Sequence, residues 1–269
     1  MARDIVDDRL IGALHVRALT RAGLAHDHAT EHTVFQSGTL DALMAGRYDG
    51  DVTIGELLAH GDLGIGTVQH LGGELVVLDG EAWVVDADGA VRPVPAETRT
   101  PFAVVCRFTP VATTALAGPL DLGAVHAALD ALAPPDEPVV AVRLTGQFSN
   151  LRLRSVRAQT PPNPPLTEVT EHQTEWQVGA ATGTLLGFRF PAATAGVEVP
   201  GYHLHFLSDD RACGGHVLGL GLVAGTAAVD DAGDLHVELP AGVHLGRPGA
   251  GADLDAIRRV EGRRVEGGA

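Results

Sequence analysis

The sequence predicts an α+β protein that is rich in β-strands, with two lobes, mixed or antiparallel sheets and a few short helices. Three observations predict this class. Stretches of alternating apolar and polar residues recur along the chain, and Asp-Gly pairs typical of hairpin turns interrupt them. Helical patterns occur, but each is short. The proline-rich segment PPNPPL, residues 161–166, has the composition of a rigid linker between two lobes.

Helices are predicted at the beginning of the chain. Residues 1–30 are predicted to form a weakly amphipathic helix followed by a polar tail. Residues 39–48 and 53–62 have the pattern of two short helices. The second has Thr53 and Glu56 at the spacing of a capping box, in which each side chain accepts a hydrogen bond from the other residue's backbone.

Strands dominate the rest of the chain, apart from one further helix at residues 121–135, which Pro134 ends because proline lacks the backbone N–H that a helix needs. Alternation and β-branched residues mark the strands. The stretches predicted as strands are residues 73–94, with turns at 79–80 and 88–89, and residues 101–108, 139–148, 151–159, 182–191 and 234–240, together with a hairpin at residues 201–220.

The predicted division of the chain follows the linker. An N-terminal helix and tail occupies residues 1–30, a β-rich lobe residues 31–165, and a second β lobe residues 166–269. A chain of 269 residues is long enough for two modest lobes with a sizeable core. We expect the two lobes to work as one functional unit.

Charge and cysteine content exclude several classes of protein. The formal net charge is −15, and all 19 basic residues are arginines. An acidic chain is repelled by the phosphates of nucleic acids and by anionic membranes, so neither is an expected partner. The two cysteines, Cys106 and Cys213, lie far apart in the sequence, which argues against a disulfide framework and a cysteine-rich zinc module.

The sequence also predicts a cytoplasmic protein that does not contact a membrane. The N-terminal segment 1–30 carries Asp4, Asp7 and Asp8 and lacks the basic and apolar regions of a signal peptide. The longest apolar run, residues 217–229, is too short to cross a bilayer as a helix.

Three histidines stand out in the predicted hairpin, GYHLHFLSDDRACGGHVLGL. His203 and His205 are two residues apart, so on a strand they share one face and lie about 6.8 Å apart along it. A turn centred between Asp210 and Arg211 pairs residues whose numbers add up to 421. His216 then faces His205, with about 5 Å between their Cβ atoms. The spacing brings three imidazoles to one point on the C-terminal β-hairpin.

Three converging imidazoles suit Zn²⁺, and a site with three protein ligands keeps further positions for water or substrate, as catalytic zinc sites do. The alternative is a set of hydrogen-bonded core histidines. The convergence of all three beside Gly214 and Gly215 favours the metal site.

Several motifs resemble those of one enzyme family. HGDLGIGT at residues 60–67, LGGEL at 71–75, LTGQF at 144–148 and PGYHLHFLSDDRACGGHVLGL at 200–220 look like the motifs of the α-acetolactate decarboxylases, in the same order. The combination of HGD-x-G-x-GT, LTG-x-F and H-x-H-x10-H is specific, whereas no single piece is. The resemblance runs from about residue 33 to the C-terminus and leaves out the N-terminal segment 1–30.

The resemblance implies a zinc-dependent carboxy-lyase, a homodimer, that converts 2-acetolactate to acetoin and CO₂ through a metal-stabilised enediolate. It implies that His203, His205 and His216 hold Zn²⁺. Thr67 and Glu74 match active-site positions of the family. The family usually has Asp-Gly-Glu where this chain has Gly-Gly-Glu at residues 72–74, a departure that keeps the glutamate.

Two further catalytic positions are assigned by counting along the chain from the neighbouring motifs. The active-site arginine corresponds to Arg154, with Arg152 and Arg157 near enough to replace it after a small shift of register. A second active-site glutamate corresponds to Glu266, with Glu261 as the alternative. The acid would deliver a proton, and the arginine would bind a carboxylate or an oxyanion.

The residues alone leave ordinary structural roles open for these positions. Glu74 fits an exposed strand start, Arg154 fits a solvated strand face, and Glu266 fits a frayed terminus. No glycine-rich nucleotide loop is present, since GDLGIGT does not lead from a strand into a helix, so no organic cofactor is expected.

A second function from another class remains open. The PPC-type (DUF296) DNA-binding domains also resemble the histidine hairpin, which would then hold a structural metal in a DNA-binding module. Those domains are roughly half as long as this chain, an acidic chain is poorly suited to phosphate contacts, and residues 1–110 would have no explanation. Retention on heparin or DNA at physiological salt would favour the module.

Overall fold

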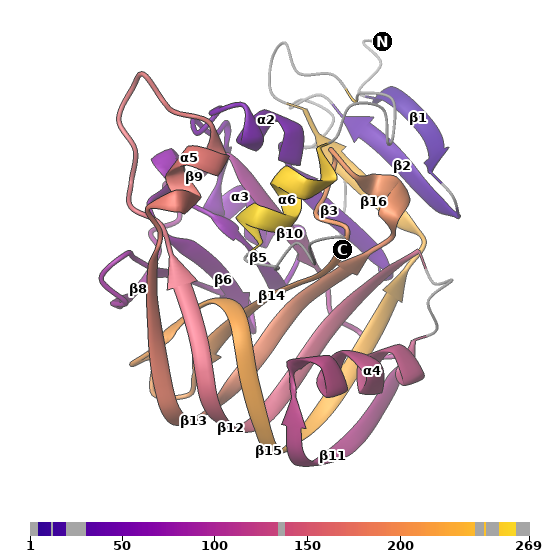
Figure 1. The fold of residues 1–269 in the computed structure, drawn as a ribbon. Coiled ribbons are helices and arrows are strands. Elements are labelled where there is room, and N and C mark those ends of the chain that lie inside the picture. The colour runs from indigo at the N-terminus through magenta and orange to yellow at the C-terminus, as the bar shows by residue number, and fades with distance from the viewer. Residues whose placement is uncertain are drawn as a thin grey trace, which may run out of the picture.

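The computed structural model describes residues 5–11, 13–19, 31–133, 138–239, 245 and 253–261. Figure 1 shows two large groups of strands, one above the other in this view, with short helices among and in front of them. Strands far outnumber helices, and both parallel and antiparallel pairs occur, so the predicted α+β class with mixed and antiparallel sheets is confirmed. No helix in the described parts of the chain is long and apolar enough to cross a membrane.

The larger sheet is formed mainly by the first part of the chain and includes one late strand. Its strands are β1 (Ile5–Ile11), β2 (Leu14–Leu19), β3 (Thr33–Ser37), β5 (Leu63–Thr67), β6 (Glu74–Leu78), β7 (Glu81–Val85), β8 (Val91–Pro93), β10 (Phe102–Cys106) and β16 (Asp234–Glu238). Their order among the described residues is β1-β2-β16-β3-β10-β5-β6-β7-β8. Strand β16 runs parallel to its neighbours β2 and β3, and the other pairs are antiparallel.

The second sheet is built from long strands. They are β11 (Ala112–Asp121), β12 (Val139–Ser155), β13 (Thr174–Phe190), β14 (Gly201–Ser208) and β15 (Gly214–Ala232), in the order β11-β15-β12-β13-β14. The start of β15 also pairs with β14. The histidine hairpin therefore links β14, the last strand in this order, directly back to β15. A small separate pair joins β4 (Val52–Thr53) to β9 (Arg99–Thr100).

The helices are short. They are α2 (Leu40–Met44), α3 (Ile54–Leu58), α4 (Leu122–Leu132), α5 (Leu166–Glu171) and α6 (Leu254–Val260), with 3₁₀ turns η1 (Gln69–Leu71) and η2 (Ala192–Thr194). The predicted capping box of α3 is confirmed, because Thr53 Oγ1 accepts from Glu56 N at 3.3 Å and Glu56 Oε2 accepts from Thr53 N at 2.8 Å. The predicted helix at residues 121–135 corresponds to α4, and Pro134 lies outside the described residues.

The predicted helix within residues 1–30 is wrong, because the described part of this segment forms strands β1 and β2. In β2 the buried side chains Leu14, Val16 and Ala18 alternate with half-exposed His15 and Arg17, which is a period of two and therefore a strand pattern. The strand forms because β16, which comes from near the other end of the chain, offers it a paired edge. The predicted polar tail lies outside the described residues.

The two sheets do not separate at the predicted lobe boundary between residues 165 and 166. Strands β11 and β12 precede that boundary and belong to the second sheet, while β16 follows it and belongs to the first. The PPNPPL segment therefore links two strands of one sheet, β12 and β13, through α5. Sequence composition marks a rigid segment here, but it does not reveal the long-range pairing that decides which sheet each strand joins.

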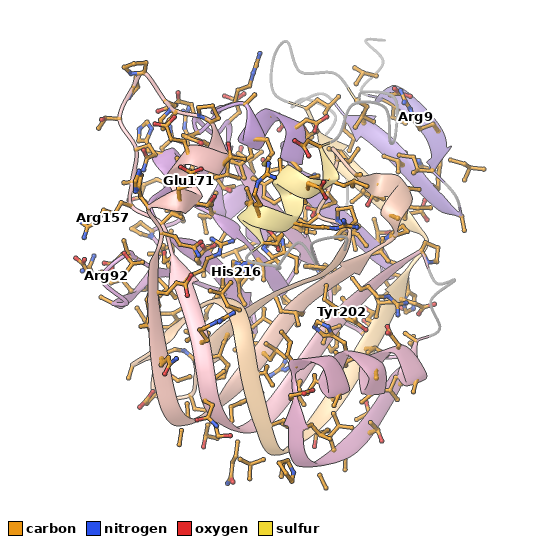
Figure 2. The ribbon with its side chains drawn as sticks, in the orientation of Figure 1. Arg9, Arg92, Arg157, Glu171, Tyr202 and His216 are labelled. Carbon is orange, nitrogen blue, oxygen red and sulfur yellow. The ribbon has the colours of Figure 1, made fainter. Side chains whose placement is uncertain are left out.

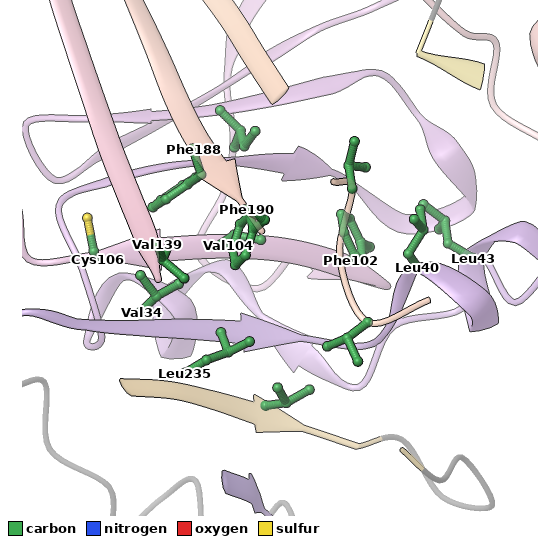
Figure 3. Packing of buried hydrophobic residues seen from close by; sticks show 14 of the residues in the cluster. Val34, Leu40, Leu43, Phe102, Val104, Cys106, Val139, Phe188, Phe190 and Leu235 are labelled. Carbon is green, nitrogen blue, oxygen red and sulfur yellow. The ribbon is translucent and has the colours of Figure 1, made fainter. Parts of the chain in front are cut away.

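One large hydrophobic cluster lies between the two sheets. Its buried side chains include Val34 and Val104 from the first sheet and Val139 and Phe188 from the second (Figure 3). A second apolar cluster packs α4 against the long strands. Because the two sheets share one core, a side chain from each sheet can be held at a fixed position relative to the other.

The stretch predicted as two strands at residues 139–148 and 151–159 is one strand, β12, that runs to Ser155. Asn150 adopts a positive φ of 49°, and the pairing with β15 shifts between Ser149 and Arg152. This irregularity fits a β-bulge, which redirects the side chains that follow it.

Candidate metal centre

The candidate site lies where the two sheets meet. His203 and His205 come from β14, His216 from β15 and Arg154 from β12, all in the second sheet. The first sheet contributes Thr67 at the end of β5 and Glu74 at the start of β6, and these two residues pair in the antiparallel β5–β6 ladder. Glu261 is the residue that follows α6. Figure 2 shows His216 near the upper end of β15, below α6 in this view.

The predicted hairpin register is confirmed. His205 pairs with His216 in the β14–β15 ladder, as the turn centred between Asp210 and Arg211 requires. The ring centroids of His203, His205 and His216 lie 5.1 to 5.5 Å apart. One nitrogen from each ring lies within 4.8 Å of the other two, and all three residues are buried. This arrangement matches the donor set that Zn²⁺ prefers.

His205 shows best that the donor set fits a metal. Its Nδ1 lies 2.8 Å from the carbonyl oxygen of Leu75, which can only accept, so Nδ1 carries the proton. The lone pair is then on Nε2, which is buried and has no hydrogen-bond partner among the described residues. Burial holds the pKa of His205 well below its usual range, and the charge of His203 lowers it further. A neutral imidazole held by a carbonyl is the state in which histidine binds metals.

A buried ion pair borders the histidines. Arg154 Nη1 donates to Glu74 Oε1 at 2.9 Å, and both side chains are less than one-tenth exposed. Glu74 Oε2 lies 3.4 Å from His205 Nε2. Burial raises the pKa of Glu74 to about 7, against the opposing effect of the Arg154 charge. The glutamate therefore faces the arginine on one side and the imidazoles on the other.

Of the three candidate arginines, only Arg154 lies inside the site. It pairs with His216 across the β12–β15 ladder and is buried. Arg152 is exposed and donates from Nη2 to the carbonyl oxygen of Leu218 at 3.3 Å. Arg157 is exposed, with Nη2 3.6 Å from Asp88 Oδ1, and Figure 2 shows it at the edge of the molecule away from His216. The pairing of β12 with β15 shifts between Arg152 and Leu153, so the two arginines differ in their surroundings, although a regular strand would place both on one face.

Thr67 and two glycines fix the backbone around these side chains. Thr67 Oγ1 donates to the carbonyl oxygen of Gly73 at 2.8 Å, which ties the end of β5 to the residue before Glu74. Gly73 has a φ of +130°, and a Cβ there would lie 2.4 Å from the carbonyl oxygen of Val85. Gly215 has a φ of +129°, and a Cβ there would lie 2.8 Å from the carbonyl oxygen of Arg154. Both positions require glycine, and each precedes a site residue.

Glu261, the alternative to Glu266, lies at the site. It is buried, and its Oε2 is 3.7 Å from His216 Nε2. Helix α6 positions it: Asp253 caps the helix by accepting from Asp255 N and Ala256 N, and Ile257 and Val260 bury the inner face. Glu266 lies outside the described residues. The sequence carried a signal for α6, an N-cap aspartate before apolar residues three apart.

The polar residues of the site line a cavity whose remaining lining is apolar. Thr67, Glu74, Arg154, His203 and Glu261 form its polar side. Leucine, valine and phenylalanine side chains from α2, α5, α6, β10 and the segment before β14 form much of its apolar lining, among them Leu40, Leu43, Phe102, Leu166, Val199 and Val260. Sequence reasoning missed this apolar lining, because apolar residues that line a cavity have the same pattern as those that fill a core.

Sequence reasoning also missed Glu198, in the segment GVEVPG just before β14. It is fully buried, its Oε2 accepts from Val199 N at 2.8 Å, and burial raises its pKa to about 8. The negative charge of Glu261 raises the pKa further, so the two carboxyl groups affect each other. The available signal for a buried carboxyl group was a single acidic residue between two valines, Val197 and Val199.

The comparisons with known proteins agree on one family. The profile of the alpha-acetolactate decarboxylases matches residues 34–245. The alpha-acetolactate decarboxylase of Methylococcus capsulatus is 40% identical over 95% of this chain and 96% of its own length. That of Klebsiella aerogenes is 36% identical over 82% of this chain and 85% of its own. The crystal structure of the Bacillus subtilis strain 168 enzyme superposes with a TM-score of 0.80, at 31% identity, over 86% of this chain and 99% of that one.

Proposed function

The chain belongs to the alpha-acetolactate decarboxylase family and is a carboxy-lyase, and we propose that it converts 2-acetolactate to acetoin and CO₂ with one Zn²⁺ held by His203, His205 and His216. The match begins at residue 34, so it includes the N-terminal half that a DNA-binding module would leave unexplained. The observation that carries the metal assignment is the convergence of three buried imidazole nitrogens within 4.8 Å, with His205 Nε2 lacking a hydrogen-bond partner among the described residues.

The reaction defines what the site must do. Acetolactate is a 2-hydroxy-3-keto acid; when the bond to its carboxylate breaks, the electron pair moves onto the neighbouring carbonyl and leaves an enediolate. One proton added to the carbon that lost CO₂ then gives acetoin. A bound zinc ion supplies Lewis-acid stabilisation of the negative charge that develops on the substrate oxygens.

Arg154 is proposed to bind the substrate carboxylate or oxyanion. Glu74 accepts from one end of its guanidinium and holds the plane in place. Arg154 Nε is buried and has no hydrogen-bond partner among the described residues, so a donor remains for a substrate oxygen. A planar guanidinium presents parallel N–H groups that match a carboxylate. Thr67, which lines the same cavity, is proposed to help position the substrate.

Glu261 is proposed as the residue that delivers the proton. It follows α6 and lines the same cavity as Glu74 and Arg154. Glu74 is held by Arg154, so we assign it an orienting role. A carboxyl fixed on one side of the cavity protonates one face of a planar enediolate, which would make the acetoin a single stereoisomer.

Metal removal tests the proposed function. Protein treated with a chelator and desalted is expected to lose at least about 10³-fold in acetoin formation, because several kcal/mol of transition-state stabilisation leave with the metal. Added Zn²⁺ should restore the activity. Acetoin measured with and without zinc is the readout, and equal turnover by metal-free protein, checked by elemental analysis, would refute the zinc assignment.

Glu261→Gln is expected to reduce acetoin formation about 100-fold, because the amide cannot donate the proton that a carboxylic acid delivers. The zinc content should be unchanged. Glu266→Gln is the matched variant, since both glutamates lie in the last residues of the chain and both were candidates. If Glu266→Gln is the inactive protein and Glu261→Gln is near wild type, the proton donor is Glu266. Chiral chromatography of the acetoin reports whether the stereochemistry is lost.

We also propose that the protein is a cytoplasmic homodimer, as the family resemblance implies. Native mass spectrometry of the purified protein measures the assembly directly, and a monomer at micromolar concentration would contradict the proposal.

A further inference from the structure

Arg152 occupies a position next to the site that the proposed mechanism does not use. It lies on β12 two residues before Arg154, and it is exposed where Arg154 is buried. Its partners across the sheet are Gln177 on β13 and Gly219 on β15. A Cβ on Gly219 would meet only Arg152 Cβ, at 3.9 Å, so no other atom crowds the arginine on the side of Gly219.

The side chain lines a second cavity that reaches the candidate metal centre. Arg152 shares this cavity with His126, Tyr202, His216 and Glu261. Glu261 also lines the cavity that holds Glu74 and Arg154, so the two cavities meet at this residue. The positive charge of Arg152 is therefore near an approach from solvent to the histidines.

The charge of Arg152 is not neutralised by a neighbour. Among the described residues, no carboxylate lies within ion-pair distance of it, and its hydrogen bond goes to the carbonyl oxygen of Leu218. The cations of a neighbouring cavity differ in this respect: Arg189 Nη1 lies 2.5 Å from Asp130 Oδ1, and Arg258 Nη1 lies 3.3 Å from Asp255 Oδ1.

A local positive charge matters because the whole chain is acidic. At a net charge of −15, the protein repels a small carboxylate anion at long range. Salt screens charges beyond about 8 Å at physiological ionic strength, so a cation at the mouth of the site acts most strongly on a substrate that is about to enter. Arginine keeps its charge at every physiological pH.

We propose that Arg152 guides small anionic substrates into the site, acting on capture and not on the chemical step; the identity of the anion as a 2-hydroxy-3-keto carboxylate rests on the proposed function. Arg152→Gln then lowers kcat/KM about 5-fold at low ionic strength and leaves kcat unchanged. The ratio of wild-type to variant kcat/KM falls towards one as salt is added. Arg152→Lys keeps kcat/KM near wild type, since guidance needs a charge and not a planar fork.

The experiment measures kcat and KM for acetoin formation by the zinc-loaded protein over a series of NaCl concentrations. Arg92→Gln is the control for net charge: it removes the same single charge from an arginine on β8 that pairs with Asp86 and that Figure 2 shows at the edge of the molecule. It should match wild type. Equal kcat/KM values for wild type and Arg152→Gln at low salt, or a lower kcat that Arg152→Lys fails to restore, would overturn the proposal.

A binding measurement separates this inference from the proposed function. Calorimetric titration with lactate, a 2-hydroxy carboxylate without the keto group, is run on the same proteins and salt series. If wild type forms no acetoin but binds lactate more tightly than Arg152→Gln at low salt, the proposed reaction fails and the guidance role stands. If acetoin forms and neither measurement distinguishes the two proteins, the guidance role alone fails.

Discussion

Replacing His205 by alanine is expected to remove zinc and decarboxylase activity together, with a fall in acetoin formation of at least about 10³-fold, or about 4 kcal/mol. His205 is the fully buried member of the three histidines, and the carbonyl of Leu75 fixes its orientation. Alanine removes one of three protein ligands, and two imidazoles hold the ion much more weakly. Elemental analysis and an acetoin assay on the same preparation measure both effects.

The control for this variant is His172→Ala, which removes an exposed histidine after α5 and should leave zinc content and activity unchanged. Circular dichroism checks that His205→Ala retains the wild-type strand content. Full metal occupancy in a folded His205→Ala protein would refute the three-histidine site. The variant protein should also lose the rise in thermal midpoint that zinc gives the wild type, since a ligand that binds the folded state stabilises it.

Arg154→Lys is expected to lower kcat/KM about 100-fold, or about 2.7 kcal/mol, while zinc stays bound. Lysine keeps a positive charge beside Glu74, so the buried carboxylate retains a cation and the fold should persist. The ammonium cannot reproduce the planar pair of N–H groups that a carboxylate accepts, so transition-state binding weakens. Steady-state kinetics with elemental analysis test this expectation.

The matched control is Arg152→Lys, the same change two residues away on the exposed part of β12. It should remain near wild type. A damaged Arg152→Lys beside a normal Arg154→Lys would move the substrate-binding arginine to position 152. An uncharged substitute at position 154 is less informative, because a buried glutamate without its cation destabilises a fold by about 3 to 5 kcal/mol.

The histidine hairpin could be predicted from the sequence because all of its determinants are local. A period of two puts His203 and His205 on one face, and the position of a tight turn decides that His216 faces His205. The capping box of α3 was predictable for the same reason, since its two residues are three apart. In each case one element, or two adjacent ones, contains everything that the geometry needs.

The parts that could not be predicted depend on contacts between distant segments. Strand β2 was taken for a helix because its partner β16 lies at the other end of the chain. The position of Glu261 depends on how α6 packs, and the different surroundings of Arg152 and Arg154 accompany a shift of the β12–β15 register between Arg152 and Leu153. Spacing along the chain limits such alternatives to a few, and only the packing of other elements selects among them.

Strand β16 has a consequence for the order in which the protein can fold. It is inserted between β2 and β3, so the strand that joins the first hairpin to the rest of the larger sheet comes from near the end of the chain. During synthesis the N-terminal hairpin must wait until residue 238 has left the ribosome before its inner edge is paired. Pairing between segments so distant in the sequence also makes folding slow, since a large loop must close before any contact stabilises it.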